Sequence, residues 1–355
     1  MEIRSSPVLR TSVLVFAGMA ALFALDTFLA KTDEAARQAT ARRLFEEGQR
    51  LERQGFLGEA VGTFRTALSN ARSNRQYQLA LAQALVAAGR APEAEASLTE
   101  LLDQDSTDGG ANLTMARLLA GEGKIPEAIA YYRRAIYGRW REDADGNRVR
   151  ARFELVDLLA RQGEKRELLA ELLPLQDEAP QDAETRMRIG RLFLTAGAPN
   201  RATEVFRSVL RRRPQDADAY AGLGEAEFAL GRYRTAQGDF LAALRSRPGG
   251  AQIQAQLELC RQVLALDPNG RGIGARERYQ RSRKLVDLAL EGARNCAGAT
   301  PPQPLAEVMK KRPGPDVEGN LDLAEQLWQA WHGECGTATS PQDQALALVM
   351  ARLAQ

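Results

Sequence analysis

Apolar and polar positions along this chain follow helical spacing, and in one region the pattern repeats itself. Between residues 183 and 250, five marked positions return after 34 residues. The pairs are Gly190 and Gly224, Gly197 and Gly231, Ala202 and Ala236, Phe206 and Phe240, and Pro214 and Pro248. A fixed period of this size indicates stacked helical units, because a single unit cannot bury its apolar face alone.

Each repeated position has a physical role in a unit made of two helices and a turn. Gly190 and Ala202 are small residues that let neighbouring helices approach closely, and Phe206 fills the space opposite. Gly197 lies at the break between two helical runs, where a residue that can adopt positive φ ends a helix. Pro214 follows the second run and cannot continue it. The unit is therefore helix A, turn, helix B and stop.

This unit resembles the tetratricopeptide repeat (TPR), which has a small residue in helix A, Gly at the turn, then Ala, a bulky aromatic and Pro at fixed offsets. The matching positions of the second unit are Tyr220, Leu223, Gly224, Gly231, Tyr233, Ala236, Phe240, Ala243 and Pro248. The resemblance implies an all-α fold, a right-handed solenoid of helical hairpins with about seven repeats over residues 41–295. It also implies a protein that acts by binding other proteins.

The repeats can be followed along the chain by their turn glycines. Gly55, Gly89 and Gly123 are 34 residues apart and predict the first three repeats. The next turn glycine, Gly163, comes 40 residues after Gly123, so six residues are inserted before repeat four. We expect the insertion in Gly138–Arg148, which is turn-rich and charged, and we expect it to be exposed.

The last part of the chain departs from the repeat pattern. A seventh unit begins at Ala251 but has a longer loop in place of the turn. Residues 296–355 are predicted to form a helical cap, which a solenoid needs because its open end exposes apolar surface. Its predicted helices cover residues 305–311, 317–332 and 342–353.

Two cysteines, Cys296 and Cys335, bracket this cap. A disulfide between them would fasten the cap to the preceding helix if the domain lies in an oxidising, extracytoplasmic compartment. Two free thiols are the alternative.

The first thirty residues predict a membrane anchor. Residues 11–30 are apolar apart from Asp26 and a few hydroxyl groups, and they are numerous enough to span a bilayer with Asp26 near one interface. Residues 1–10 then form an N-terminal tail, and residues 31–40 form a linker to the solenoid. A cleaved signal peptide is the alternative, with its best cleavage site after Ala24.

The orientation of this anchor depends on the flanking charges. Arg4 and Arg10 resemble the positive segment of a signal peptide, which stays in the cytoplasm. Lys31 and Arg37 follow the span and favour the opposite orientation under the positive-inside rule. We favour a single-pass signal-anchor in a bacterial membrane with the solenoid in the periplasm. The opposite orientation, with the solenoid facing the cytoplasm, is the alternative.

Composition and motifs argue against nucleic-acid binding and against conventional catalysis. Charged residues make up 26% of the chain and the net charge is only +2, without the basic stripe of a nucleic-acid binder. His332 lies three residues from Cys335, but no third group is evident that would orient a nucleophilic pair. The cysteines lack metal-ligand spacing. We predict a protein that is not an enzyme, with no cofactor, metal site, small-molecule substrate or nucleic-acid partner.

By resemblance, the second, fifth, ninth and twelfth positions of each TPR unit face inward and mark a partner-binding groove. The predicted groove residues are Phe45, Gln49, Leu79, Gln83, Arg117, Arg150, Phe153, Asp157, Met187, Arg191, Glu225 and Phe228. Arg42, Gln76 and Asp218 occupy equivalent positions. This mixture of apolar and charged side chains suits an extended segment or a helix of another protein. The Lys/Asn/Arg set with which some TPR proteins hold chaperone tails is absent.

The sequence therefore predicts a membrane-anchored TPR scaffold. Its expected partners are integral membrane proteins or their extended segments, which it binds as a subunit of a membrane complex. A transient assembly or quality-control factor for envelope or membrane proteins is the alternative in the same class. The alternative of another class is an enzyme with its site in residues 296–355.

Overall fold

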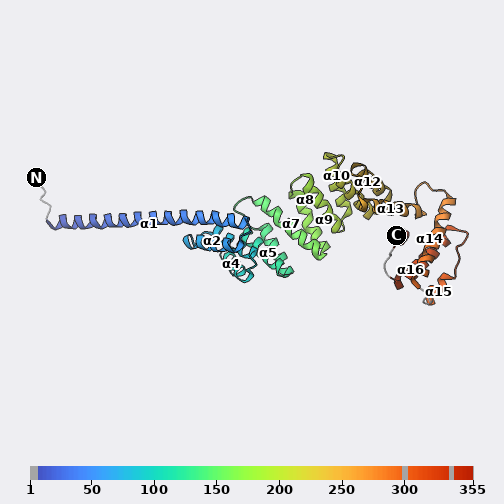
Figure 1. Cartoon of the computed structure of the whole chain (residues 1–355), viewed down its shortest axis with the longest axis horizontal. Helices are drawn as coiled ribbons and strands as arrows, with labels where there is room; N and C mark the ends of the chain where they lie inside the picture. Colours follow the sequence, from blue (N-terminus) through green and yellow to red (C-terminus); the bar gives the residue numbers. More distant parts are fainter. Residues whose placement is uncertain (1–6, 298–302, 336–339, 355) are drawn as a thin grey trace. The chain divides into compact units, whose positions relative to one another are not determined.

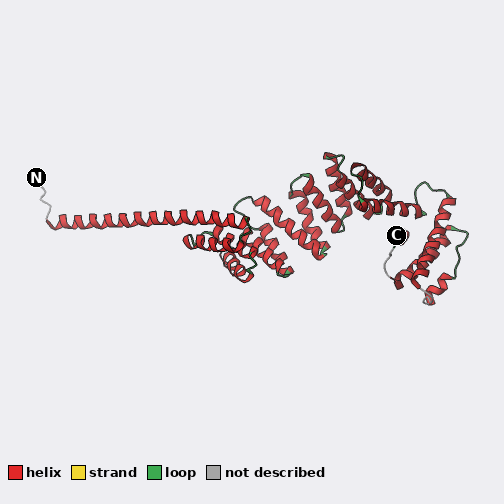
Figure 2. Ribbon diagram, viewed as in Figure 1, coloured by secondary structure: helices red, strands yellow, loops and turns green. Residues whose placement is uncertain are grey.

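The structure is a computed structural model that describes residues 7–297, 303–335 and 340–354. This part of the chain is helical and contains no strand (Figure 2). Its helices are α1 (Pro7–Arg53), α2 (Leu57–Asn70), α3 (Arg75–Ala87), α4 (Ala91–Gln104), α5 (Gly109–Gly121), α6 (Ile125–Tyr137), α7 (Ala144–Gln162), α8 (Lys165–Glu178), α9 (Ala183–Thr195), α10 (Pro199–Arg212), α11 (Ala217–Ala229), α12 (Tyr233–Ser246), α13 (Ala251–Leu266), α14 (Ala275–Ala297), α15 (Gln303–Met309), α16 (Val317–Cys335) and α17 (Pro341–Leu353).

The helices, most of which are labelled in Figure 1, belong to two compact units, residues 1–157 and residues 158–355. In the first unit, α1 packs on α2, α3 on α4 and α5 on α6. In the second unit, α9 packs on α10 and α11 on α12 in the same manner. The all-α solenoid of helical hairpins that the 34-residue period predicts is therefore confirmed.

Glycine determines how closely the two helices of a hairpin approach. A Cβ atom on Gly190 would lie 2.5 Å from the ring of Phe206, and one on Gly224 would lie 2.6 Å from the ring of Phe240. Both rings are fully buried. Any larger side chain at these glycines would collide with the ring, as expected for a close-packed interior.

The turn and the start of each hairpin also follow the sequence. All six turn glycines have positive φ, between 70° and 84°, where a residue with a Cβ atom is strained. They are Gly55, Gly89, Gly123, Gly163, Gly197 and Gly231. Four A helices begin at a side chain that caps the first backbone N–H groups. These N-caps are Asn74, Asp108, Asp182 and Asp216.

The six-residue insertion is partly helical, unlike the exposed turn expected for Gly138–Arg148. Only the first six residues of that stretch form a connection, because α7 already begins at Ala144 and lengthens helix A of repeat four at its start. Asp143, just before α7, adopts φ of 43°. Its carboxylate accepts a hydrogen bond from the N–H of Gly146 at 3.3 Å, which favours this helix start.

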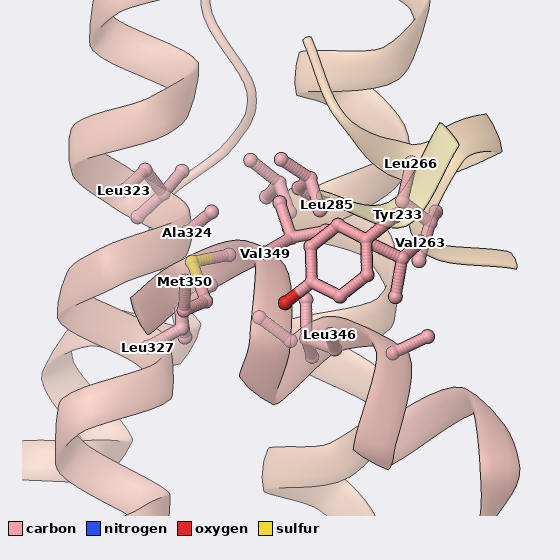
Figure 3. Packing of buried hydrophobic residues seen from close by; sticks show 13 residues of the cluster. Tyr233, Val263, Leu266, Leu285, Leu323, Ala324, Leu327, Leu346, Val349 and Met350 are labelled. Carbon is pink, nitrogen blue, oxygen red and sulfur yellow. The ribbon is translucent and has the colours of Figure 1, made fainter. Parts of the chain in front are cut away.

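The C-terminal helices α15, α16 and α17 correspond to the three helices predicted for the cap. α17 packs on α13 and α14, and α16 packs along α14. Figure 3 shows Leu346, Val349 and Met350 of α17 packed among buried side chains of the neighbouring helices. An ion pair of 3.0 Å between Arg352 and the buried Asp267 fastens α17 to the end of α13. α17 therefore covers apolar surface at the end of the repeats.

The predicted tail, anchor and linker do not form separate elements beyond residue 6. Residues 7–40 belong to the single helix α1, which continues into helix A of the first repeat. In the described part of the chain, no helix combines the length and the apolar character needed to cross a membrane. The transmembrane helix at residues 11–30 and the periplasmic location therefore stay predictions.

Candidate functional site

Two apolar residues that were expected to line the groove lie in the core. Phe45 on α1 is 8% exposed, and its ring stacks on that of Tyr77 with centroids 4.5 Å apart. The ring of Phe64 lies on it as well, with centroids 5.7 Å apart. Met187 on α9 is equally buried. Phe45 and Met187 therefore offer little exposed surface, and their role in partner binding stays a prediction.

Four further groove residues are half-buried. Phe228 packs edge-to-face on Tyr233, with ring centroids 5.1 Å apart, and contributes to the packing around α12 and α13. Gln49 is half-buried on α1. Phe153 and Asp157 on α7 already interact with other groups of the chain. None of these four lies with the residues of the pocket described below.

In the second unit, the charged residues predicted for the groove lie near groups of opposite charge. Burial raises the pKa of Glu225 on α11, and the nearby exposed Arg191 on α9 acts against that shift. Asp218 accepts an ion pair from Arg247 at 2.6 Å, and this contact lowers the pKa of Asp218. The two carboxylates and two guanidiniums therefore leave little net charge on this face.

Four predicted groove residues meet in one pocket of the first unit. Leu79, Gln83, Arg117 and Arg150 line a space of about 340 Å³ between α3, α5 and the start of α7. We call it the insertion pocket, since the inserted segment before α7 forms one wall. Its other lining residues are Arg75, Gln76, Asp108, Gly110, Leu113, Arg139, Trp140, Arg141, Glu142 and Asn147.

The inserted segment is held in place by backbone pairing. Arg139 donates its N–H to the carbonyl of Thr107 at 2.7 Å and accepts the N–H of Gly109 at 2.8 Å. The indole Nε1 of Trp140 donates to the carbonyl of Ala135 at 2.9 Å. A Cβ atom on Gly109 would lie 2.4 Å from the Trp140 ring, so the ring rests directly on the start of α5. These contacts fix Trp140 as a rigid wall of the pocket.

The opposite wall depends on a second close approach. A Cβ atom on Gly110 would lie 2.7 Å from Leu79, so glycine lets α5 pack against α3 at this point. Leu79 is half-buried, while Leu113 is buried. The insertion pocket therefore combines an indole ring and leucine side chains in one place.

Three guanidiniums around the pocket have carboxylate partners. Arg117 forms two hydrogen bonds with Glu154, at 2.8 Å and 2.6 Å, and these bonds raise the pKa of the guanidinium. The other two pairs are Arg75 with Asp108 at 3.2 Å and Arg139 with Asp105 at 2.8 Å. Bidentate and networked pairs of this kind hold both partners in a fixed position.

Two further guanidiniums at the pocket have no such partner. Among the described residues, no carboxylate pairs with Arg141 or Arg150, and both side chains are exposed. The guanidinium of Arg150 contacts only the side-chain oxygen of Asn147, at 3.1 Å. Glu142 also lines the pocket without an ion pair. Outside the paired groups, the lining therefore carries two positive charges and one negative charge.

Arg75, Asp108, Trp140 and Arg141 were not among the predicted site residues. The sequence offered one signal for them, since Trp140 and Arg141 lie at the single break in the 34-residue spacing between Gly123 and Gly163. Arg75 and Asp108 open helix A of their repeats, at positions that the inward-facing pattern does not include.

The cysteines and the histidine are the remaining candidates for a catalytic or metal site. No group of metal-ligating side chains occurs in the described residues. Cys260 is a free, buried cysteine whose pKa burial raises to about 11. His332 is exposed and stacks on Trp328, with ring centroids 4.6 Å apart. The side chains of Cys296 and Cys335 lie outside the described residues, so their disulfide stays a prediction.

Comparison with known families agrees with the repeat period. Two sequence profiles described as tetratricopeptide repeats match the chain, one at residues 45–109 and 187–251 and the other at residues 85–139. The chain therefore contains tetratricopeptide repeats. The TPR fold is one of protein-interaction scaffolds. No curated protein matches this TPR chain significantly.

Three solved structures are similar to this chain at low identity. YrrB, described as a TPR protein with an unusual peptide-binding site, is 17% identical with a TM-score of 0.44, over 54% of this chain and 95% of YrrB. The type IV pilus biogenesis factor PilW is 19% identical with a TM-score of 0.43, over 61% of this chain and 98% of PilW. A TPR protein from Parabacteroides merdae is 14% identical with a TM-score of 0.41, over 88% and 99% of the two chains.

Proposed function

We propose that this TPR protein is a membrane-attached scaffold whose insertion pocket binds an extended segment of a partner protein. The segment carries an apolar side chain next to an acidic one. The partner is a membrane protein, and the scaffold is a lasting subunit of the complex that they form.

The observation that carries this proposal is the combination of groups in the insertion pocket. Trp140, Leu79 and Leu113 supply an apolar surface, and Arg141 and Arg150 supply charges that no carboxylate of the described chain neutralises. Apolar anchors beside a few well-placed polar groups are typical of sites that bind peptides and ligands. A guanidinium recognises a carboxylate with paired hydrogen bonds, so an acidic residue of the partner fits this position.

Site-specific crosslinking tests the pocket. A photoreactive amino acid replaces Gln76, an exposed residue that lines the pocket, in the full chain within its own membranes. We expect a defined protein adduct that Arg141→Glu with Arg150→Glu removes. The same amino acid at the exposed Glu59 of α2 is the control and should give no such adduct. Identical products at both positions, or none at Gln76, would count against the proposal.

Membrane attachment is supported by the exposed apolar side chains of α1. Six large residues of this helix are between 53% and 72% exposed, which is unusual for a surface without a partner. They are Met19, Leu22, Phe23, Leu25, Phe28 and Leu29. We propose that a bilayer covers this stretch, with the repeats on the extracytoplasmic side.

Alkaline extraction of membranes tests this attachment. The full chain should stay in the membrane pellet, and a variant without residues 11–30 should be released because it lacks the apolar stretch. Release of both forms would contradict membrane insertion. Purification in mild detergent then tests the role as a subunit, for which we expect partners in fixed stoichiometry rather than a diffuse, substoichiometric mixture.

A further inference from the structure

The second unit contains a pocket whose charged lining is entirely basic. It has a volume of about 230 Å³ and lies between the start of α9 and the end of α10. Arg186, Arg211 and Arg212 line it together with Ser208 and Gln181, and no carboxylate is part of the lining. This pocket, which we call the arginine pocket, is separate in sequence and in unit from the insertion pocket.

Arg186 is a buried charge without an ion-pair partner among the described residues. The residue is only 8% exposed, and its Nη1 donates to the carbonyl of Gln176 at 2.8 Å. Its Nε is buried without any hydrogen-bond partner. Burial and the nearby charge of Arg212 lower the pKa of Arg186, and the charges of Asp177 and Asp182 offset this shift only in part. Buried charges in proteins are normally paired, because an isolated one is costly.

The position of Arg186 carries a charge in some repeats and not in others. The residue 34 positions earlier is the buried Arg152, and the residue 34 positions later is Tyr220, which has no positive charge. Asp182 is the acidic residue nearest in sequence, but its carboxylate caps α9 by accepting the N–H of Thr185 at 2.9 Å. It forms no ion pair with Arg186 among the described contacts.

The other two guanidiniums add to the excess of positive charge. Arg211 and Arg212 are exposed at the end of α10, and neither forms an ion pair in the described part of the chain. Arg212 donates to the backbone carbonyl of Gln181, a neutral acceptor, which holds its guanidinium at the pocket. Three guanidiniums thus line one small space, and the hydrogen bonds of Arg186 and Arg212 go to backbone carbonyls.

We propose that the arginine pocket binds a phosphate group, either as the free ion or as a phosphate monoester. A phosphate carries up to two negative charges and three acceptor oxygens that match the planar fork of a guanidinium. It would neutralise the buried Arg186 and accept hydrogen bonds from Arg211 and Arg212. This site does not depend on the proposed scaffold function.

Calorimetric titration of the full chain with inorganic phosphate in a chloride buffer of constant ionic strength tests the site. We expect saturable binding of one phosphate per chain. Arg211→Gln with Arg212→Gln should raise the dissociation constant at least about tenfold, because each charged hydrogen bond is worth about one order of magnitude. Arg234→Gln with Arg245→Gln, two exposed arginines of α12 outside the pocket, should leave it unchanged.

Absence of saturable binding to the wild-type chain would overturn the proposal, as would equal weakening by both double variants. If the double variant unfolds, the single Arg211→Gln variant is the substitute, because this side chain is exposed. Titration with O-phosphoserine separates the two sources of phosphate. Tighter binding of the monoester assigns the site to phosphorylated ligands, and tighter binding of inorganic phosphate assigns it to the free ion.

Discussion

Among single side chains, Asp239 on α12 is in a setting that disfavours its charge. Burial and the neighbouring Glu227 raise the pKa of Asp239 from 3.8 to about 6, and Arg207 only partly offsets them. Its Oδ2 atom is buried without a hydrogen-bond partner. Glu227 is fully buried but has Arg207 at 2.7 Å and Arg232 at 3.2 Å as ion-pair partners. The two arginines therefore stabilise Glu227 and leave Asp239 poorly compensated.

Replacing Asp239 with Asn should stabilise the second unit at neutral pH. Since the folded-state pKa is raised, the folded protein holds this proton up to about pH 6, and stability falls as the pH rises from about 4 to 6. For a fully buried carboxyl group, a pKa shift of this size corresponds to about 3 kcal/mol in the free energy of unfolding. Asp239 is only half-buried, so solvent screening reduces the expected gain in the free energy of unfolding to about 1–2 kcal/mol. Thermal unfolding at pH 7.5 should show a midpoint higher by about 2–8 °C.

The gain from Asp239→Asn should shrink as the pH falls and disappear near pH 4. Asp322→Asn, a change at an exposed residue of α16 in the same unit, is the control and should not alter the midpoint at either pH. An Asp239→Asn variant whose midpoint matched that of the wild type at pH 7.5 would show that the Asp239 charge is well compensated.

At the scale of elements, the inserted segment before α7 gives the first unit a feature that its other repeats lack. It pairs with residues 107–109 and brings Trp140 onto the start of α5. The period locates the insertion, because Gly163 is displaced by six residues from its expected position. It does not reveal the pocket, because the pairing joins residues about 32 apart in sequence, and such a tertiary contact leaves no periodic signal.

The contact between Gly109 and Trp140 gives a prediction for the inserted segment. Gly109→Ala should destabilise the first unit by about 1–3 kcal/mol, because the new Cβ atom would lie 2.4 Å from the indole ring. Chemical denaturation should measure this loss, and Trp140 fluorescence should change with it. The control is Gly62→Ala on α2, where nothing lies within 4 Å and the helix should gain about 0.5–1 kcal/mol. Equal stability of the two alanine variants would contradict the close approach of the Trp140 ring to Gly109.

At the scale of the whole molecule, the sequence was most informative where the repeat constrains packing. Gly190 and Phe206 predict a close helix pair, because a small residue and a large ring must face each other. The groove was less predictable, since an inward-facing position does not reveal whether a neighbour covers it. Phe45 illustrates this, because Tyr77 from the next hairpin stacks on its ring. Leu79 and Arg117, in contrast, line the insertion pocket.

The helical cap should contribute to the stability of the second unit as a whole. Leu346 of α17 is fully buried in the cluster that joins α13, α14 and α16 (Figure 3). Leu346→Ala should therefore lower the free energy of unfolding of this unit by about 2–5 kcal/mol. Leu173→Ala on α8 is the matched control, and it should have a much smaller effect because Leu173 is 41% exposed.

Hydrogen exchange should show how far the effect of Leu346→Ala extends. Repeats are coupled mainly to their neighbours, so backbone protection should decrease most in α13, α14, α16 and α17 and least in α3 and α5. A uniform decrease along the chain would mean that the solenoid unfolds as one cooperative body. Unchanged protection in α13 and α14 would mean that α17 does not stabilise the end of the repeats. The predicted gradient follows because α17 packs on α13 and α14 within the second unit.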